Sequence, residues 1–405
     1  MPFVVFAAPQ LSPNAMGMIE AAASLPDVHL GVITQEPAEK LPVHLVSRVA
    51  HWRVDDVLDT NQLIWAAREL GVRYGPIHRL FGAYEQLQVP LAQARATLGV
   101  HGLSAAAATN FRDKSRMKDV LRANGVPCAR HALVRSLPEA EAFGSSSGYP
   151  LVVKPPAGAG AQQTFRVANA EQLRAALGIV RPNAAQPVLL EEFIIGAEHS
   201  LESISIDGEA AWHSLTHYYP TPLHVLENPW IQWCVMLPRE VDHPRYDDIK
   251  DAARRALKAL GMTTGLSHME WFRRRDGTVA ISEVAARPPG AQITTLVSRA
   301  HDIDFVQAWI RLMVFNTFDV PSRKYAAGAA FLRGQGEGKV RAVHGWEQIA
   351  RAFNEIITDV KLPEIGSERS PSYEGEGYIL VRHPETAAVE QALSQIVSVM
   401  RVELG

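Results

Sequence analysis

"YPLVVKPPAGAGAQQTFRV", residues 149–167, is the stretch that decides the fold of this chain. An apolar run ends on Lys154, a loop of prolines, glycines and small residues follows, and "TFRV" again has the residues of a strand. In a P-loop the lysine comes after the glycines and opens a helix, so this order excludes that motif. The stretch predicts two strands joined by a flexible tip, where Gly158 and Gly160 let the backbone approach a ligand. An ordinary exposed hairpin fits the same residues equally well.

The composition is that of a globular protein with a core. The chain has 405 residues, of which 47% are hydrophobic and 20% are charged. This length suggests about two to four domain-sized units. The formal net charge of −3 gives no reason to expect a nucleic-acid partner. The two cysteines, Cys128 and Cys234, suit a reducing compartment and exclude a disulfide framework or a zinc cluster.

The N-terminus and the hydropathy pattern predict a soluble cytoplasmic protein that does not enter a membrane. "MPFVVFAAPQLSP" has no basic segment before its short apolar run, so it reads as a first strand and not as a signal peptide. No apolar run approaches the roughly 20 residues that a membrane span needs.

Residues 1–105 alternate strand and helix patterns. "FVVFAA" and "HLGVIT" are strand-like, whereas "NAMGMIEAAASL" and "DTNQLIWAARELG" have helical periodicity, the latter with Asp59 or Thr60 as its cap. This rhythm predicts a small parallel sheet covered by helices. "APQLSPNAMG" stands where a G-x-G-x-x-G loop would follow the first strand, which argues against a dinucleotide site there.

The rest of the chain mixes both kinds of element. Residues 109–127 predict a helix that ends at Asn124-Gly125, and residues 246–260 predict another with one buried stripe. Residues 301–316 also look helical, and residues 325–405 read as a compact α+β region.

Two glutamates mark the most informative hairpin. Glu270 and Glu283 flank an Asp276-Gly277 turn, so on paired antiparallel strands they can face the same side. Two such carboxylates repel unless a cation compensates, and magnesium takes one or two carboxylates plus nucleotide phosphates. Arg287 follows at four residues from Glu283, and an arginine can bridge oxygens of a phosphate or carboxylate. The alternative is that both glutamates are surface residues paired with the arginines at 273–275.

In their order, these pieces resemble the ATP-grasp superfamily across nearly the whole chain. The matching pieces are Lys114, the strand with Lys154 and its glycine loop, "EEFIIGAEHS", Glu270 and "SEVAARPPG". The chain looks closest to carboxylate–amine ligases of the L-amino-acid (dipeptide) ligase type. Biotin carboxylase and the formate-dependent purine transformylase are more distant matches.

The resemblance implies an α/β (α+β) chain with an ATP-grasp fold in four parts. Residues 1–105 would form an open parallel α/β domain, and residues 106–195 the small ATP-grasp lobe with the phosphate-covering glycine loop. Residues 196–324 would form the large lobe with the metal and substrate site, and residues 325–405 a C-terminal α+β subdomain.

The resemblance also implies roles for particular residues. Lys114 and Lys154 would contact the phosphates of ATP, and Glu270 and Glu283 would bind Mg²⁺, with Mn²⁺ as an alternative. Arg287 would steady the transferred phosphoryl group, and together with Lys154 it is the predicted catalytic pair. The remaining predicted ATP contacts are Gly158 and Gly160 in the loop, the hinge residues Glu191, Glu192, Phe193 and Ile194, with Glu191 near the adenine amino group, and Glu198 on the ribose.

The substrate pocket is predicted from residues 217–238, an aromatic-rich segment that borders the amino-acid site in the dipeptide-ligase type. Core or interface packing is the alternative for these aromatic residues. His268, two residues before Glu270, points to the same face of its strand, where a structural role competes with a supporting one. The candidate substrate contacts are Arg287, Gly290, His217, Tyr218, Trp230 and His268.

One position departs from the pattern. The family commonly has Glu-x-Asn-x-Arg in the last motif, whereas this chain has "EVAAR", with Ala285 in place of the asparagine. Alanine cannot ligate a metal, so a second metal site lacks a protein ligand.

The resemblance implies an ATP-dependent ligase that joins a small-molecule acid to an amine through an acyl phosphate and releases ADP and phosphate. Two alternatives stay open. One is an ATP-grasp enzyme with another acceptor, of the carboxylase or formyl-phosphate kind, and the other is a nucleotide-binding protein without catalysis, which only Ala285 supports. Many relatives are dimers, so a homodimer is the expected assembly.

Overall fold

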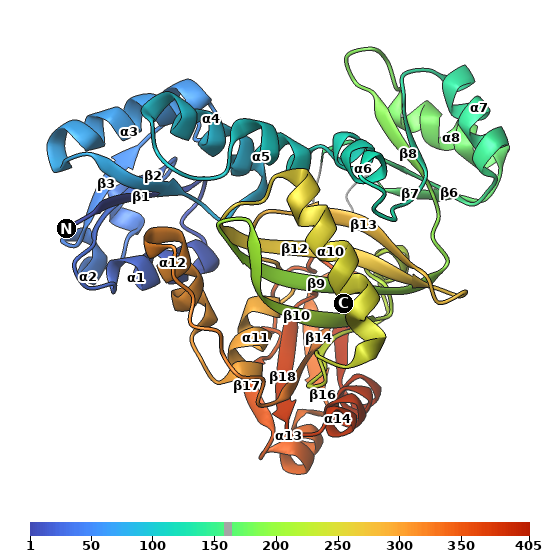
Figure 1. Ribbon diagram of the computed structural model, residues 1–405. Coiled ribbons are helices and arrows are strands. Elements are labelled where there is room, and N and C mark those ends of the chain that lie inside the picture. The colour runs from blue at the N-terminus through green and yellow to red at the C-terminus, as the bar shows by residue number, and fades with distance from the viewer. Residues whose placement is uncertain (158–163) are drawn as a thin grey trace.

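A computed structural model describes residues 1–157 and 164–405. Three lobes surround a central sheet, with the N-terminal lobe at upper left, a small lobe at upper right and the last two helices of the chain at the bottom (Figure 1). Within the described residues the chain forms four sheets. Gly158 and Gly160 lie outside the described residues.

The N-terminal lobe is a parallel sheet in the order β3-β2-β1-β4. Alternate residues of β1 face two apolar layers, so Val4 and Phe6 pack with helix α1, while Val5 and Ala7 pack with α3 and α4. Burial on both faces explains why β1 is continuously apolar, and it confirms the predicted parallel sheet. The elements are β1 (Phe3–Ala8), α1 (Pro13–Ala23), β2 (His29–Thr34), α2 (Val43–Val46), β3 (Val49–Arg53), α3 (Thr60–Tyr74), β4 (Ile77–Phe81), η2 (Glu85–Leu87), α4 (Gln88–Leu98) and α5 (Ala105–Arg112).

The small lobe is an antiparallel sheet in the order β5-β8-β6-β7. Pairing of Leu151 on β6 with Val167 on β7 confirms that the opening stretch is strand, loop and strand. Before this sheet, α6 ends at its C-cap Asn124, as predicted, but it begins only after Asp113, because residues 109–112 belong to α5. The elements are α6 (Lys114–Ala123), β5 (His131–Val134), α7 (Leu137–Ser147), β6 (Leu151–Lys154), β7 (Phe165–Val167), α8 (Ala170–Val180) and β8 (Val188–Glu192).

The central sheet has the strand order β13-β12-β9-β10-β11-β14-β18-β17 within the described residues. Helix α10 covers one face, and α11 and α12 cover the other, where α12 also packs against α1. The elements are β9 (Gly196–Ile206), β10 (Glu209–Tyr219), α9 (Pro222–Glu227), β11 (Trp233–Leu237), α10 (Asp247–Leu260), β12 (Gly265–Arg274), β13 (Val279–Ala285), α11 (Ile293–His301), α12 (Phe305–Phe315), β14 (Ala326–Leu332), β17 (Ile357–Lys361) and β18 (Gly377–His383).

One prediction changes in its bounds at this level. The helix expected at 301–316 is α12, which begins only at Phe305, because Asp302 adopts a left-handed conformation that ends the preceding helix α11 and Asp304 caps α12. Strands β14, β17 and β18 from the C-terminal region continue the central sheet, so the boundary predicted near residue 325 would cut through one sheet and remains a prediction. The last elements are β15 (Gly334–Gln335), β16 (Val340–His344), α13 (Trp346–Phe353), α14 (Thr386–Val399) and β19 (Arg401–Leu404).

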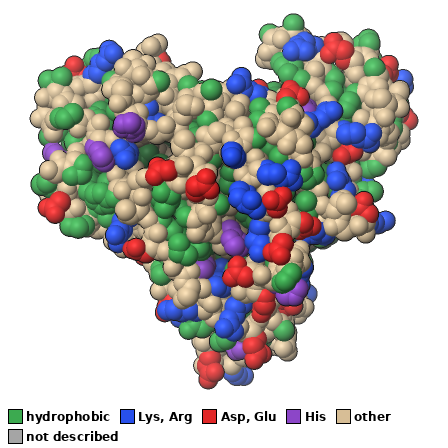
Figure 2. All heavy atoms as spheres, viewed as in Figure 1, with side chains coloured by type: hydrophobic (Ala, Val, Ile, Leu, Met, Phe, Trp, Pro, Cys, Tyr) green, Lys and Arg blue, Asp and Glu red, His purple; other side chains and the backbone are tan. Residues whose placement is uncertain are grey.

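The visible surface carries mixed charge. Figure 2 shows acidic and basic side chains interspersed over this face, with a notch between the two upper lobes. In the described part of the chain no helix is long and apolar enough to cross a membrane.

We expect Gly196→Ala to destabilise the fold by about 1–3 kcal/mol, because β9 and β12 approach too closely there for a side chain. A methyl group at Gly196 would lie 2.2 Å from the carbonyl oxygen of Arg273. Urea unfolding measures the change. The matched control is Gly17→Ala in α1, where no heavy atom lies within 4 Å. That substitution should stabilise by about 0.5–1 kcal/mol through helix propensity, and equal effects at both sites would contradict the close approach.

Candidate active site

A cavity of about 310 Å³ lies where the small-lobe sheet meets the central sheet. Strands β6 and β8 supply one side, β9, β12 and β13 the other, and residues from β10, α9, β11, α11 and the loop before β18 complete it. Most of the residues predicted from sequence meet here. Those that line the cavity are Lys114, Lys154, Glu191, Glu192, Phe193, Ile194, Glu198, Tyr218, His268, Glu270, Glu283, Arg287 and Gly290.

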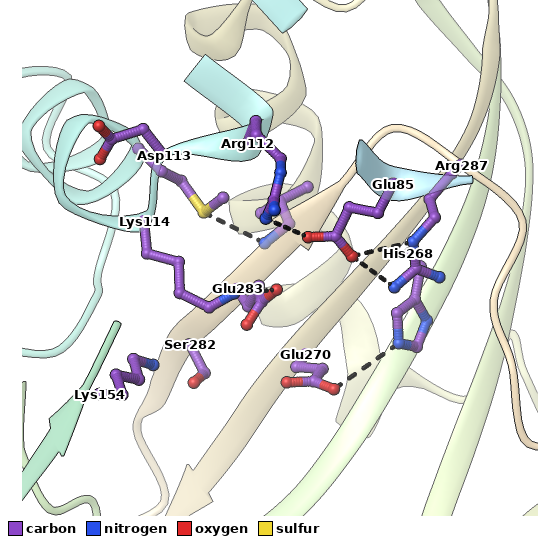
Figure 3. Close-up of polar contacts among 12 residues, drawn as sticks. Glu85, Arg112, Asp113, Lys114, Lys154, His268, Glu270, Ser282, Glu283 and Arg287 are labelled. Carbon is purple, nitrogen blue, oxygen red and sulfur yellow. Dashed lines mark hydrogen bonds and ion pairs between the residues drawn. The ribbon is translucent and has the colours of Figure 1, made fainter. Parts of the chain in front are cut away.

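The two predicted phosphate-binding lysines are each held by a carboxylate. Lys114 opens α6, and its Nζ lies 2.6 Å from Oε1 of Glu283 (Figure 3). Lys154 ends β6, and its Nζ lies 2.9 Å from Oε2 of Glu191. The ammonium groups of Lys114 on α6 and Lys154 on β6 therefore lie at one end of the cavity, where an anionic ligand could contact both.

The side chain of Glu191 makes contacts that the sequence analysis did not predict. Its carboxylate bridges Lys154 and the fully buried Lys118, whose Nζ lies 3.3 Å from Oε1. Burial alone would raise the pKa of Glu191, but the two lysines lower it below its ordinary value. The physical reason is that a carboxylate between two buried ammonium groups is needed to neutralise them. Sequence reasoning missed Lys118, which looked like one of several charged residues on a helix.

The acidic pair lies as its spacing predicted. Glu270 and Glu283 are direct cross-strand partners on β12 and β13, on either side of the Asp276-Gly277 turn. Arg273 pairs with Asp248, so it is engaged elsewhere. Burial would raise the pKa of Glu283, but Lys114 and Lys154 lower it to about 2.

The donor set fits a magnesium ion that shares its ligands with a nucleotide. Glu270 and Glu283 offer carboxylate oxygens from adjacent strands, and Mg²⁺ commonly takes one or two carboxylates and completes its shell with water and phosphate. Ala285 is buried and pairs with His268, so it offers no ligand. Among the described residues no three His, Cys, Asp or Glu side chains are grouped to hold a metal unaided.

Glu198 is a buried carboxyl on β9 at the same cavity. Burial, together with the charges of Glu270 and Glu283, raises its pKa well above the ordinary value. A protonated carboxyl can donate a hydrogen bond as well as accept one, which suits a hydroxyl-bearing ligand.

His268 is anchored from behind by a buried glutamate that the sequence analysis did not single out. Its Nδ1 lies 2.8 Å from Oε1 of Glu202, and its Nε2 lies 3.8 Å from Oε1 of Glu270 (Figure 3). Glu202 also accepts hydrogen bonds from the hydroxyls of Ser200 and Thr216. Burial alone would lower the pKa of His268, but its bonds to the two glutamates raise it to about 9.

The N-terminal lobe contributes a third residue that the sequence analysis missed. Glu85, in η2 just after β4, is buried and accepts two hydrogen bonds from Arg287, Nε at 3.0 Å and Nη2 at 2.8 Å. Its other oxygen accepts a bond from Nη1 of Arg112 at 3.0 Å (Figure 3). No local motif marks Glu85, because its partner Arg287 lies 202 residues away.

The aromatic segment divides between two faces of β10. Tyr218 lines the cavity, whereas His217 points to the other face, where its ring nitrogens contact Tyr219 and Tyr246. Trp230 is 60% exposed in the turn after α9. Neither residue lines the cavity, which corrects their expected place: strand alternation sends His217 and Tyr218 to opposite faces, and Trp230 lies in a turn outside the strands.

The comparison with known families identifies the class. A sequence model of the ATP-grasp domain matches residues 119–301, and this range holds the small-lobe sheet, the acidic pair and Arg287. The chain therefore contains an ATP-grasp domain and has the ATP-grasp fold.

Particular relatives are ligases of several kinds. The L-arginine-specific L-amino acid ligase of Bacillus subtilis is 24% identical over 294 residues, which cover 71% of this chain and 69% of that protein. The crystal structure of the L-amino acid ligase from Bacillus licheniformis superposes with a TM-score of 0.80 at 20% identity, covering 100% of this chain and 99% of that one. Carboxyaminoimidazole ribonucleotide synthase from Aspergillus clavatus, in complex with ATP, gives a TM-score of 0.73 at 16% identity, covering 98% of each chain. At these identities, the structural likenesses show the fold alone.

We expect Glu198→Gln to raise the stability of the protein without nucleotide at neutral pH. A carboxyl whose pKa rises on folding costs stability as the pH climbs from its unfolded value near 4.5 through the folded value, and glutamine cannot ionise. The gain over the natural protein should therefore grow with pH above 4.5 and vanish at or below it. Thermal unfolding across that range measures it. Glu36→Gln is the control, because the pKa of Glu36 is lowered by Lys40 and its loss should bring no such gain.

Proposed function

We propose that the protein is an ATP-dependent carboxylate–amine ligase. The observation that carries the proposal is the opposition of charges in one cavity, with Lys114 and Lys154 facing Glu270 and Glu283 beside Arg287. Phosphoryl transfer needs positioned charge more than it needs a nucleophilic side chain. The family match and the named activities of L-amino acid ligase relatives support this reaction over others.

In the proposed complex, nucleotide contacts spread along the cavity. Lys114 and Lys154 would bind phosphate oxygens. Glu191 to Ile194 would supply backbone groups to adenine, and Glu198 would bind the ribose hydroxyls. Glu270 and Glu283 would hold Mg²⁺, which supplies charge neutralisation at the phosphates; Mn²⁺ is the alternative ion.

The proposed chemistry has two steps. An oxygen of the substrate carboxylate attacks the γ-phosphorus, the bond to ADP breaks, and an acyl phosphate forms. The amine nitrogen then attacks the acyl carbon, phosphate leaves, and the nitrogen loses a proton. Lys154 and Arg287 would stabilise the charge that builds on the phosphoryl oxygens, and the closed cavity would keep water from the acyl phosphate.

Glu85 enters this proposal as a positioning residue. Its two bonds to Arg287, together with the bond from Nη1 of Arg287 to the carbonyl of Pro288, fix the guanidinium at the cavity wall. The N-terminal lobe would thus orient a residue that acts on substrate in the ATP-grasp domain. Small-molecule acid and amine substrates are the proposed partners, and a homodimer is the proposed assembly.

The direct test is release of ADP and phosphate from Mg-ATP against a matrix of acids and amines, with mass spectrometry of the products. An amide product that requires two organic substrates supports the ligase. Turnover with bicarbonate or formate in place of the acid would instead favour an ATP-grasp enzyme of the carboxylase or formyl-phosphate kind. The fold likeness to carboxyaminoimidazole ribonucleotide synthase is the reason to include these two substrates. ATP binding without turnover on any pair would point to a non-catalytic protein.

Lys154→Ala should weaken ATP binding about 10–100-fold while changing adenosine binding little, because one charge-assisted contact to phosphate contributes about 1.5–3 kcal/mol. Calorimetric titration with both ligands measures this. Lys250→Ala, at a surface pair with Asp247, is the control and should change neither affinity.

Glu283→Gln should abolish turnover, and intact turnover in that variant would disprove the metal assignment.

Glu85→Gln should lower kcat/KM for the acid about 10-fold or more while leaving ATP binding unchanged, because Arg287 loses its charged anchor. Steady-state kinetics with the acid and ATP varied separately measure the split. Glu141→Gln at the surface pair with Arg174 is the matched control and should have no effect. Equal losses for both substrates, or a large drop in melting temperature, would indicate a structural role only.

A further inference from the structure

The cavity has an apolar end that the proposed nucleotide contacts leave free. Its walls come from three parts of the fold, the β10–β11 region, the start of α11 and the loop between β17 and β18. The side chains that line it are Tyr218, Leu223, Trp233, Ile293 and Tyr373.

Strand order places two strands, β9 and β10, between the acidic pair and the far wall of this end. The central sheet runs β13-β12-β9-β10-β11, so the acidic pair on β12 and β13 lies at one side and Trp233 on β11 at the other. Among the described residues, each side chain that β10, α9, β11, α11 and the β17–β18 loop contribute to the cavity is uncharged. A charged group placed there would lose water without gaining a charged partner from these elements.

The rings of the aromatic wall pack against one another and against a neighbouring core residue. The ring of Trp233 lies 4.8 Å from that of Tyr373 in an edge-to-face contact and 5.7 Å from that of Tyr218. Phe331 stacks against Trp233 at 5.2 Å. The indole Nε1 donates to the carbonyl of Pro220 at 2.9 Å, so its one donor is used. Apart from the hydroxyls of Tyr218 and Tyr373, the wall therefore presents ring surface to a ligand.

A neighbouring carboxylate does not alter this character. Glu374 follows Tyr373, but it is absent from the cavity lining and its Oε1 accepts a hydrogen bond from the backbone nitrogen of Ala291 at 3.1 Å. Burial raises the pKa of Glu374, which favours its neutral form. The loop is thus tied to the start of α11, and this contact holds Tyr373 beside the cavity.

We propose that this apolar end is the subsite for the body of the acid substrate, and that it selects acids with an aliphatic or aromatic side chain. The inference rests on the proposed ligase function, because Arg287 and Gly290, which border this end, would then hold the reacting carboxylate. Leu223 and Tyr373 are the specificity-determining residues, since they bring side chains from outside the main strands of the ATP-grasp site. Acids with a charged side chain fit poorly, because these walls offer no opposite charge. Glycine fits poorly, because it has no side chain to contact the apolar wall.

The test uses the full chain with Mg-ATP and hydroxylamine in place of the unknown amine, so that an acyl phosphate is captured as a hydroxamate. The acids are phenylalanine, leucine, glycine, glutamate and lysine. We expect kcat/KM for phenylalanine or leucine to exceed that for the other three by about 10-fold or more, the scale on which an apolar pocket discriminates. A preference for glycine or for a charged acid would overturn the inference and leave the ligase standing.

Two variants test the subsite itself. Tyr373→Ala should lower kcat/KM for phenylalanine about 10-fold with the KM for ATP unchanged, and Leu223→Glu should lower it for leucine and raise it for lysine. Trp230→Ala is the matched control, because that ring is exposed and lies outside the cavity lining, and it should keep the natural profile. An unchanged profile in both subsite variants would refute the assignment. Absence of hydroxamate with every acid, despite measured ATP binding, would refute the ligase function and the inference with it.

Discussion

Neutralisation of buried charge is the constraint on which the rest of this structure depends. Lys118 and Lys154 share Glu191, Lys114 meets Glu283, and Arg112 and Arg287 share Glu85. Charges removed from water are costly unless an opposite charge lies close by. The partners come from distant segments, as with Lys114 and Glu283, which are 169 residues apart. The same pairs that make the cavity polar therefore also fix how its walls meet.

This arrangement has a bearing on ligand binding. A nucleotide bound with its cation brings charges of both signs. When it separates an ion pair of the protein, its phosphates can pair with the lysine and its cation can pair with the glutamate. The carboxylate of Glu283 could pass from an ammonium group to a cation without ever being left alone in a buried site. By contrast, a ligand that carries charge of only one sign would pair with one member of the ion pair. The other member would stay buried and charged without a partner, which costs free energy.

The sequence predicted what depends on local pattern. Alternation along β12 and β13 placed Glu270 opposite Glu283, and the residues around Lys154 predicted a hairpin that the β6–β7 pairing confirms. Alternation was misread only at His217, one position from Tyr218, because a uniformly aromatic run gives no sign of which face is buried. Glu85 and Tyr373 could not be found in this way, since their importance comes from contacts made across the fold. Glu202 did leave a signal, because Glu198, Ser200 and Glu202 put three polar residues in succession on one face of a strand.

The central sheet also limits how this protein can be divided. Strand β14 pairs with β11, which carries Trp233, and β18 pairs with β14. A chain cut before β14 would leave the edge of β11 unpaired, beside the wall that faces the ligand. The C-terminal residues are therefore not an appendage that could be exchanged between relatives as a cassette. An exchange of segments between relatives that aims to change ligand preference would have to include β11 together with β14. The reason is that β11 both carries Trp233 and forms the pairing that joins the C-terminal strands to the sheet.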